Sequence, residues 1–173
     1  MLVEGVVARE DPRGDDVRSL LERHLAFAHE HTPARHVHAL DVDALVHPSI
    51  TFVGHRLDGE LLGVGALKDL GDGTGELKSM HTAASARGRG VGTASVAHLV
   101  GLARERGLRR VSLETGTPAV FEPAWALYAR HGFVDCGPFG DYPVSTTSRF
   151  MTLDLTADLP DVVRTGRRGD HLV

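Results

Sequence analysis

The chain has 173 residues, 42% of them hydrophobic and 24% charged, and this composition is typical of one soluble globular domain. Its net charge of -4 at pH 7 argues against a general nucleic-acid-binding protein, because such proteins usually carry an excess of basic residues. The one cysteine, Cys136, excludes an intramolecular disulfide and a cysteine-built zinc site. No apolar run approaches the roughly 20 residues that span a bilayer, and the first residues lack the pattern of a secretory signal. We therefore expect a cytoplasmic protein with no membrane partner.

Hydrophobic periodicity and turn residues predict the elements of the first half of the chain. In chain order, we expect a strand over residues 2–10, a helix over 15–32, a short helical turn or loop over 38–48, and strands over 49–57, 61–70 and 76–84. Asp58 and Gly59 separate two of these strands, and an Asp-Gly pair between apolar runs is typical of a β-hairpin. Asp15 and Asp16 lie at the expected helix start, where the helix dipole favours negative charge.

The second half alternates between helices and strands. A helix with one buried face is predicted by the spacing of Val96, Leu99, Val100 and Ala103, and Gly107 follows its expected end. The remaining elements are a strand over residues 108–115, a helix within 122–133 and a strand over 149–155. Pro123 lies near the start of this helix and Gly132 just past its end. This order indicates a mixed α/β domain with helices packed on a central sheet. We expect one domain over residues 1–156 and a loose tail over 157–173.

A segment rich in glycine and arginine, residues 85–95, precedes the helix that starts near Val96; it reads SARGRGVGTAS. The first amides of a helix have no intrahelical partner, and the helix dipole adds about half a positive charge there. Glycines let the backbone approach a ligand closely, and Arg87 and Arg89 can donate charge-assisted hydrogen bonds to phosphate. The segment therefore predicts an anion-binding turn. Thr93 and Ala94 exclude the dinucleotide-binding and P-loop motifs, which require glycine at the first of these positions, and the P-loop also lysine at the second.

The same segment resembles the acetyl-CoA signature of the GNAT acetyltransferases, (Q/R)-x-x-G-x-(G/A). Its fixed positions are occupied by Arg87, Gly90 and Gly92. A second family pattern, A-x-x-L-Y-x-x-x-G-F, is matched by Ala124, Leu127, Tyr128, Gly132 and Phe133. The resemblance reaches from about Val3 to Leu155, and stretches such as GELKSM and SLETG are similar to a bacterial N-acetyltransferase subgroup. It implies the GNAT acyl-CoA N-acyltransferase fold, a central twisted, mostly antiparallel sheet flanked by helices.

The resemblance also implies where acetyl-CoA binds. The pantetheine arm is expected to pair with the strand before the turn, at Met80, His81 and Thr82. The pyrophosphate is expected on the turn itself, at Arg87, Gly88, Arg89, Gly90, Val91, Gly92 and Thr93. The strand after the helix is expected to splay away and leave a wedge for the arm.

The implied reaction is direct transfer of the acetyl group to a primary amine. The amine must lose a proton before it attacks, and a nearby acid assists departure of the thiolate. Tyr128 matches the family tyrosine and is the expected acid. Glu76 is the first candidate base, because some members carry a glutamate four residues before the position of Met80. Glu114, His81 and a chain of water molecules stay open as alternatives.

The histidines, the 138–150 loop and Trp125 suggest further hypotheses. Eleven histidines, five of them between His24 and His38, invite a metal hypothesis, but no HExxH or similar spacing supports it and we expect no metal. Residues 29–47 are a candidate wall of the acceptor pocket, and their histidines would favour an acidic or polar acceptor. Asp141 and Tyr142, in the loop over 138–150, are candidate substrate contacts or parts of a surface turn. Trp125 is expected to serve packing.

The sequence therefore predicts an N-acetyltransferase that acts on a small-molecule or amino-acid-like amine. One alternative is a non-catalytic module that senses acyl-CoA. Another is an enzyme that acetylates protein lysines or N-termini. Nucleic acid is not an expected partner, and a homodimer is one expectation because members of the family are often dimers.

Overall fold

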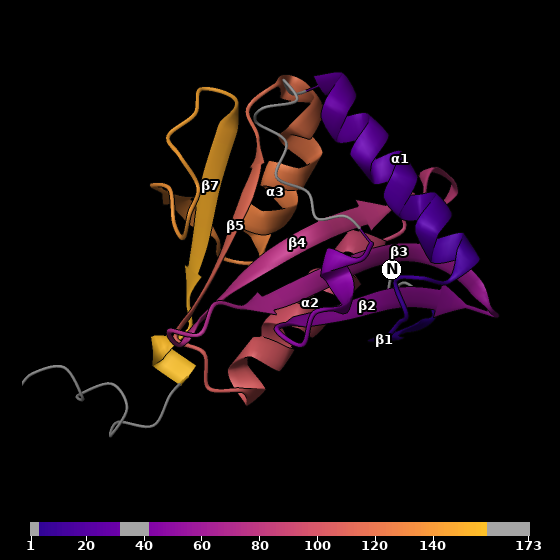
Figure 1. The fold of residues 1–173 in the computed structure, drawn as a ribbon, viewed down its shortest axis with the longest axis horizontal. Helices are drawn as coiled ribbons and strands as arrows, with labels where there is room; N and C mark the ends of the chain where they lie inside the picture. Colours follow the sequence, from indigo (N-terminus) through magenta and orange to yellow (C-terminus); the bar gives the residue numbers. More distant parts are fainter. Residues whose placement is uncertain (1–3, 32–41, 159–173) are drawn as a thin grey trace, which may run out of the picture.

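The computed structural model describes residues 4–31 and 42–158. Within them, a seven-stranded sheet has the order β1-β2-β3-β4-β5-β7-β6 (Figure 1). The strands are β1 (Val6–Arg9), β2 (Ile50–Leu57), β3 (Glu60–Asp69), β4 (Thr74–Thr82), β5 (Arg110–Gly116), β6 (Val134–Cys136) and β7 (Ser148–Asp154). The helices are α1 (Asp15–His31), α2 (Val91–Glu105) and α3 (Glu122–Arg130), with short 3-10 turns η2 (Ala44–Val46), η3 (Ala84–Ala86), η4 (Ala119–Phe121) and η5 (Thr156–Asp158).

The sheet confirms the expected mixed, mostly antiparallel fold. Every strand pair is antiparallel except β4 and β5, which run parallel. Their register is short: it begins at Thr74 opposite Arg110 and ends at Leu77 opposite Leu113. Beyond that point the two strands diverge and leave a wedge in the sheet, which is open at the top of Figure 1.

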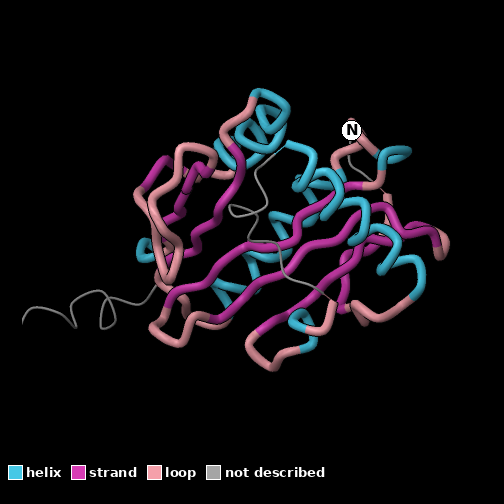
Figure 2. The backbone as a smooth tube through the Cα atoms, turned by 45° about the horizontal axis from the view of Figure 1, so that its top comes forward, coloured by secondary structure: helices cyan, strands magenta, loops and turns pink. Residues whose placement is uncertain are grey.

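The two longer helices cover opposite faces of the sheet (Figures 1 and 2). Helix α1 buries Val17, Leu20 and Leu21 against residues of β2 and β3 such as Phe52 and Leu62. On the other face, α2 buries the four residues whose spacing predicted it, together with Leu77, Val111 and Leu113 from the strands beside the wedge. Burial of such apolar side chains contributes roughly 1.5–3 kcal/mol each. The wedge is therefore framed by two well-packed layers.

Both predicted helix ends are confirmed. Gly107 follows α2 with φ 71°, and the Leu108 amide donates to the Ala103 carbonyl at 3.0 Å. Gly132 follows α3 with φ 92°, and the Phe133 amide donates to the Tyr128 carbonyl at 3.1 Å. These are hydrogen bonds of the Schellman type, which favour glycine because it adopts positive φ without a steric penalty. The second cap fixes the backbone next to Tyr128, the expected acid.

Some predicted boundaries were wrong. Strand β6 was not predicted, because its three residues are too few to show a recognisable strand pattern. Strand β4 begins at Thr74 and ends at Thr82, so it lies two residues before the predicted range of 76–84. The expected turn over 38–48 contains η2, and its first four residues lie outside the described part of the chain, as do residues 2, 3 and 159–173. Among the described helices, none combines the length and apolar character needed to cross a membrane.

Candidate active site

A cleft of about 660 Å³ occupies the wedge between β4 and β5 and continues to the start of α2. It is lined from α1 by His24, Phe27 and Ala28, and from α3 by Leu127, Tyr128 and Arg130. Most of the residues expected to bind the coenzyme also line it: Met80, His81, Thr82, Arg87, Gly88, Gly90, Val91, Gly92 and Thr93. Arg89 does not line the cleft and is exposed, so the expectation that it binds the coenzyme gains no support here.

A bulge in β4 lies where this strand leaves its parallel partner. The antiparallel register with β3 pairs Val64 with His81 and Ala66 with Lys78, so Ser79 and Met80 together oppose one residue. Ser79 has φ 55°, a conformation that costs energy for a residue other than glycine. A β-bulge bends its strand and redirects the side chains beyond it. The bend helps to open the wedge and aims His81 toward α1, where it meets His24.

The start of α2 presents backbone amides to the cleft. The first hydrogen bond of the helix runs from the Ala94 amide to the Gly90 carbonyl at 3.0 Å, so the amides of Val91, Gly92 and Thr93 precede the helical ladder. Gly88 and Gly90 have φ 75° and 82°, which explains glycine at these two positions. Val91 is 2% exposed and anchors the turn in the core. The turn can thus offer amides to an anion without losing its position.

Gly92 has a different reason to be glycine. A Cβ atom at this position would lie 2.9 Å from a methyl group of Leu127, which is closer than real Cβ atoms approach. The absence of a side chain therefore lets α2 pack directly against α3. Two family positions, Gly92 and Leu127, are linked by this single contact.

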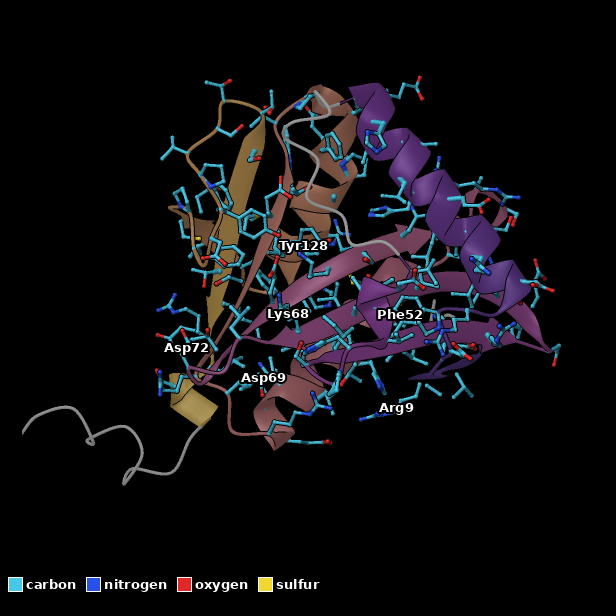
Figure 3. The ribbon with its side chains drawn as sticks, in the orientation of Figure 1. Arg9, Phe52, Lys68, Asp69, Asp72 and Tyr128 are labelled. Atoms are coloured by element: carbon cyan, nitrogen blue, oxygen red, sulfur yellow. The ribbon has the colours of Figure 1, made fainter. Side chains whose placement is uncertain are left out.

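Tyr128 lies between the diverging β4 and β5 (Figure 3). Its side chain is 7% exposed, and its ring packs edge to face against Phe133 with centroids 5.8 Å apart. Burial, together with the charge of Glu114, raises the pKa of the Tyr128 hydroxyl above its ordinary value of 10.0. The hydroxyl is therefore protonated at neutral pH, as a proton donor must be.

Glu76 belongs to a buried hydrogen-bonded network. The Lys78 ammonium donates to its carboxylate at 3.0 Å, and the Tyr142 hydroxyl donates to the same oxygen. Lys78 also donates to the Tyr142 oxygen at 2.9 Å. Burial and the charge of Glu76 raise the pKa of Tyr142, so this hydroxyl stays protonated. One carboxylate oxygen of Glu76 is thus already engaged by two donors.

Glu114 is the other carboxylate of the cleft, and its environment differs. It follows directly after Leu113, the last residue of β5 that pairs with β4. Burial raises the pKa of its carboxyl from 4.5 to about 7, with the charge of Glu76 acting in the same direction and that of Lys78 opposing it. A group with a pKa near the working pH can both accept and release a proton.

His24 and His81 form a pair across the cleft, with their Nδ1 atoms 3.3 Å apart. Burial lowers the pKa of each imidazole from 6.5 to about 4. Both rings are therefore uncharged at neutral pH. The expectation of an acidic or polar acceptor concerned other histidines, those of residues 29–47. Of these, His29, His31 and His47 do not line the cleft, and His36 and His38 lie outside the described residues, so the expectation stays a prediction.

Two other residues that the sequence singled out, Trp125 and Asp141, do not line the cleft. Trp125 donates from its indole nitrogen to the Gly116 carbonyl at 2.7 Å, and the guanidinium of Arg149 lies 4.9 Å from its ring, so the packing role is confirmed. Asp141 is exposed and does not line the cleft. In the part of the chain that the structure describes, no group of three His, Cys, Asp or Glu side chains is arranged to hold a metal ion. Lys78 was missed by sequence reasoning, because a lysine inside a strand is usually solvated.

The model of the acetyltransferase (GNAT) family matches residues 15–133, which is more than half of the chain. The chain belongs to the GNAT acetyltransferase family. It is accordingly an acetyltransferase that depends on acetyl-CoA, and its fold is the one that this family has.

Individual GNAT proteins agree with this membership. The uncharacterised N-acetyltransferase YedL of Escherichia coli K12 is 44% identical over 139 residues, which cover 80% of this chain and 87% of YedL. The IAA acetyltransferase of Azospirillum brasilense is 37% identical over 147 residues, or 84% of this chain and 94% of that protein. A solved Klebsiella pneumoniae structure, assigned to the acyl-CoA N-acyltransferases, superposes with a TM-score of 0.75 at 26% identity and covers 87% of this chain and 97% of its own.

Proposed function

We propose that this GNAT enzyme transfers the acetyl group of acetyl-CoA directly to the primary amine of a small molecule. The observation that carries the proposal is the meeting of Tyr128 and Glu114 in one cleft, the first a protonated hydroxyl and the second a carboxyl with a pKa of about 7. A proton donor and a proton acceptor are the two groups that amine acetylation requires.

The residues of the cleft fit the coenzyme. The amides of Val91, Gly92 and Thr93, with the backbone at Gly88 and the guanidinium of Arg87, would hold the pyrophosphate. The backbone of Met80, His81 and Thr82, on the β4 side of the wedge, would pair with the pantetheine arm. The bound coenzyme supplies a thioester whose acetyl carbon accepts a nucleophile.

The side chains then divide the proton transfers between them. Glu114 takes a proton from the acceptor ammonium, so that the nitrogen lone pair can form a bond to the acetyl carbon. As the bond between that carbon and the sulfur breaks, Tyr128 donates its proton to the leaving thiolate. The nitrogen becomes positively charged when its bond to the acetyl carbon forms, and it loses a second proton as Tyr128 regains one. The products are an amide and the free thiol of coenzyme A, and Glu114 releases its proton to solvent. Each proton transfer of this kind typically contributes a factor of about 10²–10⁴ to the rate.

Glu114 is our choice of base over Glu76 and His81. One carboxylate oxygen of Glu76 already accepts hydrogen bonds from Lys78 and Tyr142, so it is occupied by two donors within the protein. His81, whose pKa is about 4, is a weak base for an ammonium of ordinary pKa. Glu76 and a chain of water molecules stay alternatives that mutation can test.

The small-molecule acceptor is supported by the name of one relative, the IAA acetyltransferase, which gives a small molecule as its substrate. Protein acetylation and coenzyme sensing without turnover are the alternatives. We further propose that residues 1–156 form one catalytic domain. A homodimer and a cytoplasmic location stay predictions.

A thiol-release assay tests the proposal. The protein is mixed with acetyl-CoA and a panel of primary amines, and free coenzyme A is followed with a thiol reagent while mass spectrometry identifies the acetylated amine. We expect turnover with at least one amine and its loss in Glu114→Gln. Tight binding of acetyl-CoA with no thiol above background across the panel would favour the sensor instead.

A further inference from the structure

The cleft has a second wall on the side of α1, whose side chains have no part in the proposed coenzyme binding or proton transfers. Phe27 on α1 and Phe121 in η4 contact each other edge to face, with ring centroids 5.3 Å apart and planes at 74°. Both rings are only partly buried and both line the cleft. We name the set of His24, Phe27, His81 and Phe121 the aromatic wall.

The aromatic wall is uncharged at neutral pH. His24 and His81 are neutral because burial disfavours their protonated forms, and their Nδ1 atoms share one hydrogen bond. Ala28 and Val120 continue the wall as small apolar groups, and Val120 is 41% exposed. Ring faces and edges of this kind bind other rings and apolar chains well.

The carboxylates of the cleft are few. Among the described residues that line it, only Glu76 and Glu114 are acidic. Glu76 is neutralised by Lys78, whose side chain is 8% exposed. Glu114 is required by the amine that reacts. A second ammonium on the acceptor would find no further carboxylate among the described residues that line the cleft, and partial burial of an unpaired charge is costly.

We propose that the acceptor is a primary monoamine with an aromatic or extended apolar body, which packs on the aromatic wall while its amine reaches Glu114. This inference rests on the proposed function and narrows it to one chemical class. The wall selects against diamines and polyamines because it offers no anion, and against small polar amines because they leave its rings uncovered.

Three primary amines of different chemical class test the inference: 2-phenylethylamine, 1,4-diaminobutane and ethanolamine. We expect kcat/KM with acetyl-CoA to be at least tenfold higher for 2-phenylethylamine than for either of the others. A factor of ten corresponds to about 1.4 kcal/mol. Equal or higher kcat/KM for the diamine or for ethanolamine would overturn the inference and leave the proposed function intact.

Two substitutions test whether Phe27 and Phe121 cause the preference for 2-phenylethylamine. Phe27→Ala keeps a good helix former on α1, and Phe121→Ala removes the facing ring. Each is expected to reduce the preference for 2-phenylethylamine by about tenfold through KM, with an unchanged KM for acetyl-CoA. Val144→Ala, at a side chain that is 87% exposed and outside the cleft, is the matched control. A preference that survives both ring deletions would refute the assignment; if one variant fails to fold, the other decides.

A binding measurement separates this inference from the proposed function. 2-Phenylethylamine is titrated calorimetrically into the protein saturated with coenzyme A, for the wild type and Phe27→Ala. Should no amine be acetylated, the proposed function fails. Saturable binding that weakens in the variant would still support the aromatic wall as a site for this class, whereas no detectable binding, or equal binding in both proteins, would refute it.

Discussion

Replacing Glu114 with Gln should make the protein more stable at neutral and alkaline pH while it removes activity. The pKa of the Glu114 carboxyl is raised from 4.5 to about 7, mainly by burial. For an acid with a raised folded-state pKa, the stabilising contribution is fully present below the unfolded value of 4.5 and is lost as the pH rises through 7. The ionised carboxylate therefore destabilises the fold by on the order of 3 kcal/mol at pH 8.

Glutamine has nearly the same shape and no charge at any pH. The advantage of Glu114→Gln in the free energy of unfolding should accordingly grow by roughly 2–3 kcal/mol between pH 5 and pH 8. A change of this size moves the midpoint of thermal unfolding by about 5–10 °C in a protein of this length. Urea unfolding at pH 5, 6, 7 and 8 measures the difference, with Glu60→Gln at an exposed site as the control. Titration of His24 and His81 affects both proteins and cancels in the comparison.

Ionisation of the Glu114 carboxyl should also determine how kcat/KM depends on pH. For the wild type, kcat/KM should rise with pH through an apparent pKa near 7, because Glu114 has to be ionised to accept a proton. Glu114→Gln should lose a factor of about 10²–10⁴ in kcat/KM. A stability difference that is independent of pH would refute the burial argument. Wild-type activity in a folded Glu114→Gln protein would refute the role of Glu114 as base.

Three further variants test the rest of the site. Lys78→Met removes a positive charge that lowers the pKa of Glu114, so the rising limb of the pH profile should move to higher pH by about one pH unit; an unchanged profile would exclude this coupling. Arg87→Ala should weaken coenzyme A binding about tenfold by calorimetry, and Arg89→Ala, outside the cleft, should have a much smaller effect; equal affinities in all three proteins would contradict the pyrophosphate site. Tyr128→Phe should lower kcat by about 10²-fold with a nearly unchanged Kd for acetyl-CoA, and undiminished turnover would count against the acid role.

The features that the sequence predicted well are local ones. The hairpin at Asp58, the helix ends at Gly107 and Gly132, and the turn before α2 each depend on a few consecutive residues. Turn chemistry and capping act over one or two turns of chain, so the residues involved are visible together in the sequence. Strand β6 was not predicted because three residues carry too little pattern. It is held in the sheet by its antiparallel pairing with β7, which is distant in the sequence.

The sequence could not show that Glu114, rather than Glu76, is the better candidate for the base, and the reason is different. Glu76 and Glu114 are both glutamates in apolar strands, and the nearby Lys78, two residues after Glu76, does not by itself show which carboxylate is paired. What distinguishes them is Tyr142, which comes from a loop 66 residues away and donates to Glu76. Lys78 adds the second bond to Glu76. Hydrogen-bond partners and burial depend on distant parts of the chain. The pairing of Glu76 with Tyr142 and the burial that raises the pKa of Glu114 could therefore be found only from the structure.

The place of Glu114 follows from the way the sheet opens. The backbone pairing of β4 with β5 ends at Leu77 and Leu113, and the next residues along the two strands are Lys78 and Glu114. On its other edge β5 continues to pair with β7 as far as Gly116, so Glu114 remains in a rigid strand although its β4 side is open. Because unpaired strand edges offer amides and carbonyls, the wedge can accept an extended ligand alongside β4. The divergence that creates room for the pantetheine arm therefore also exposes the carboxyl that has to meet the amine, and a closed sheet would bury both.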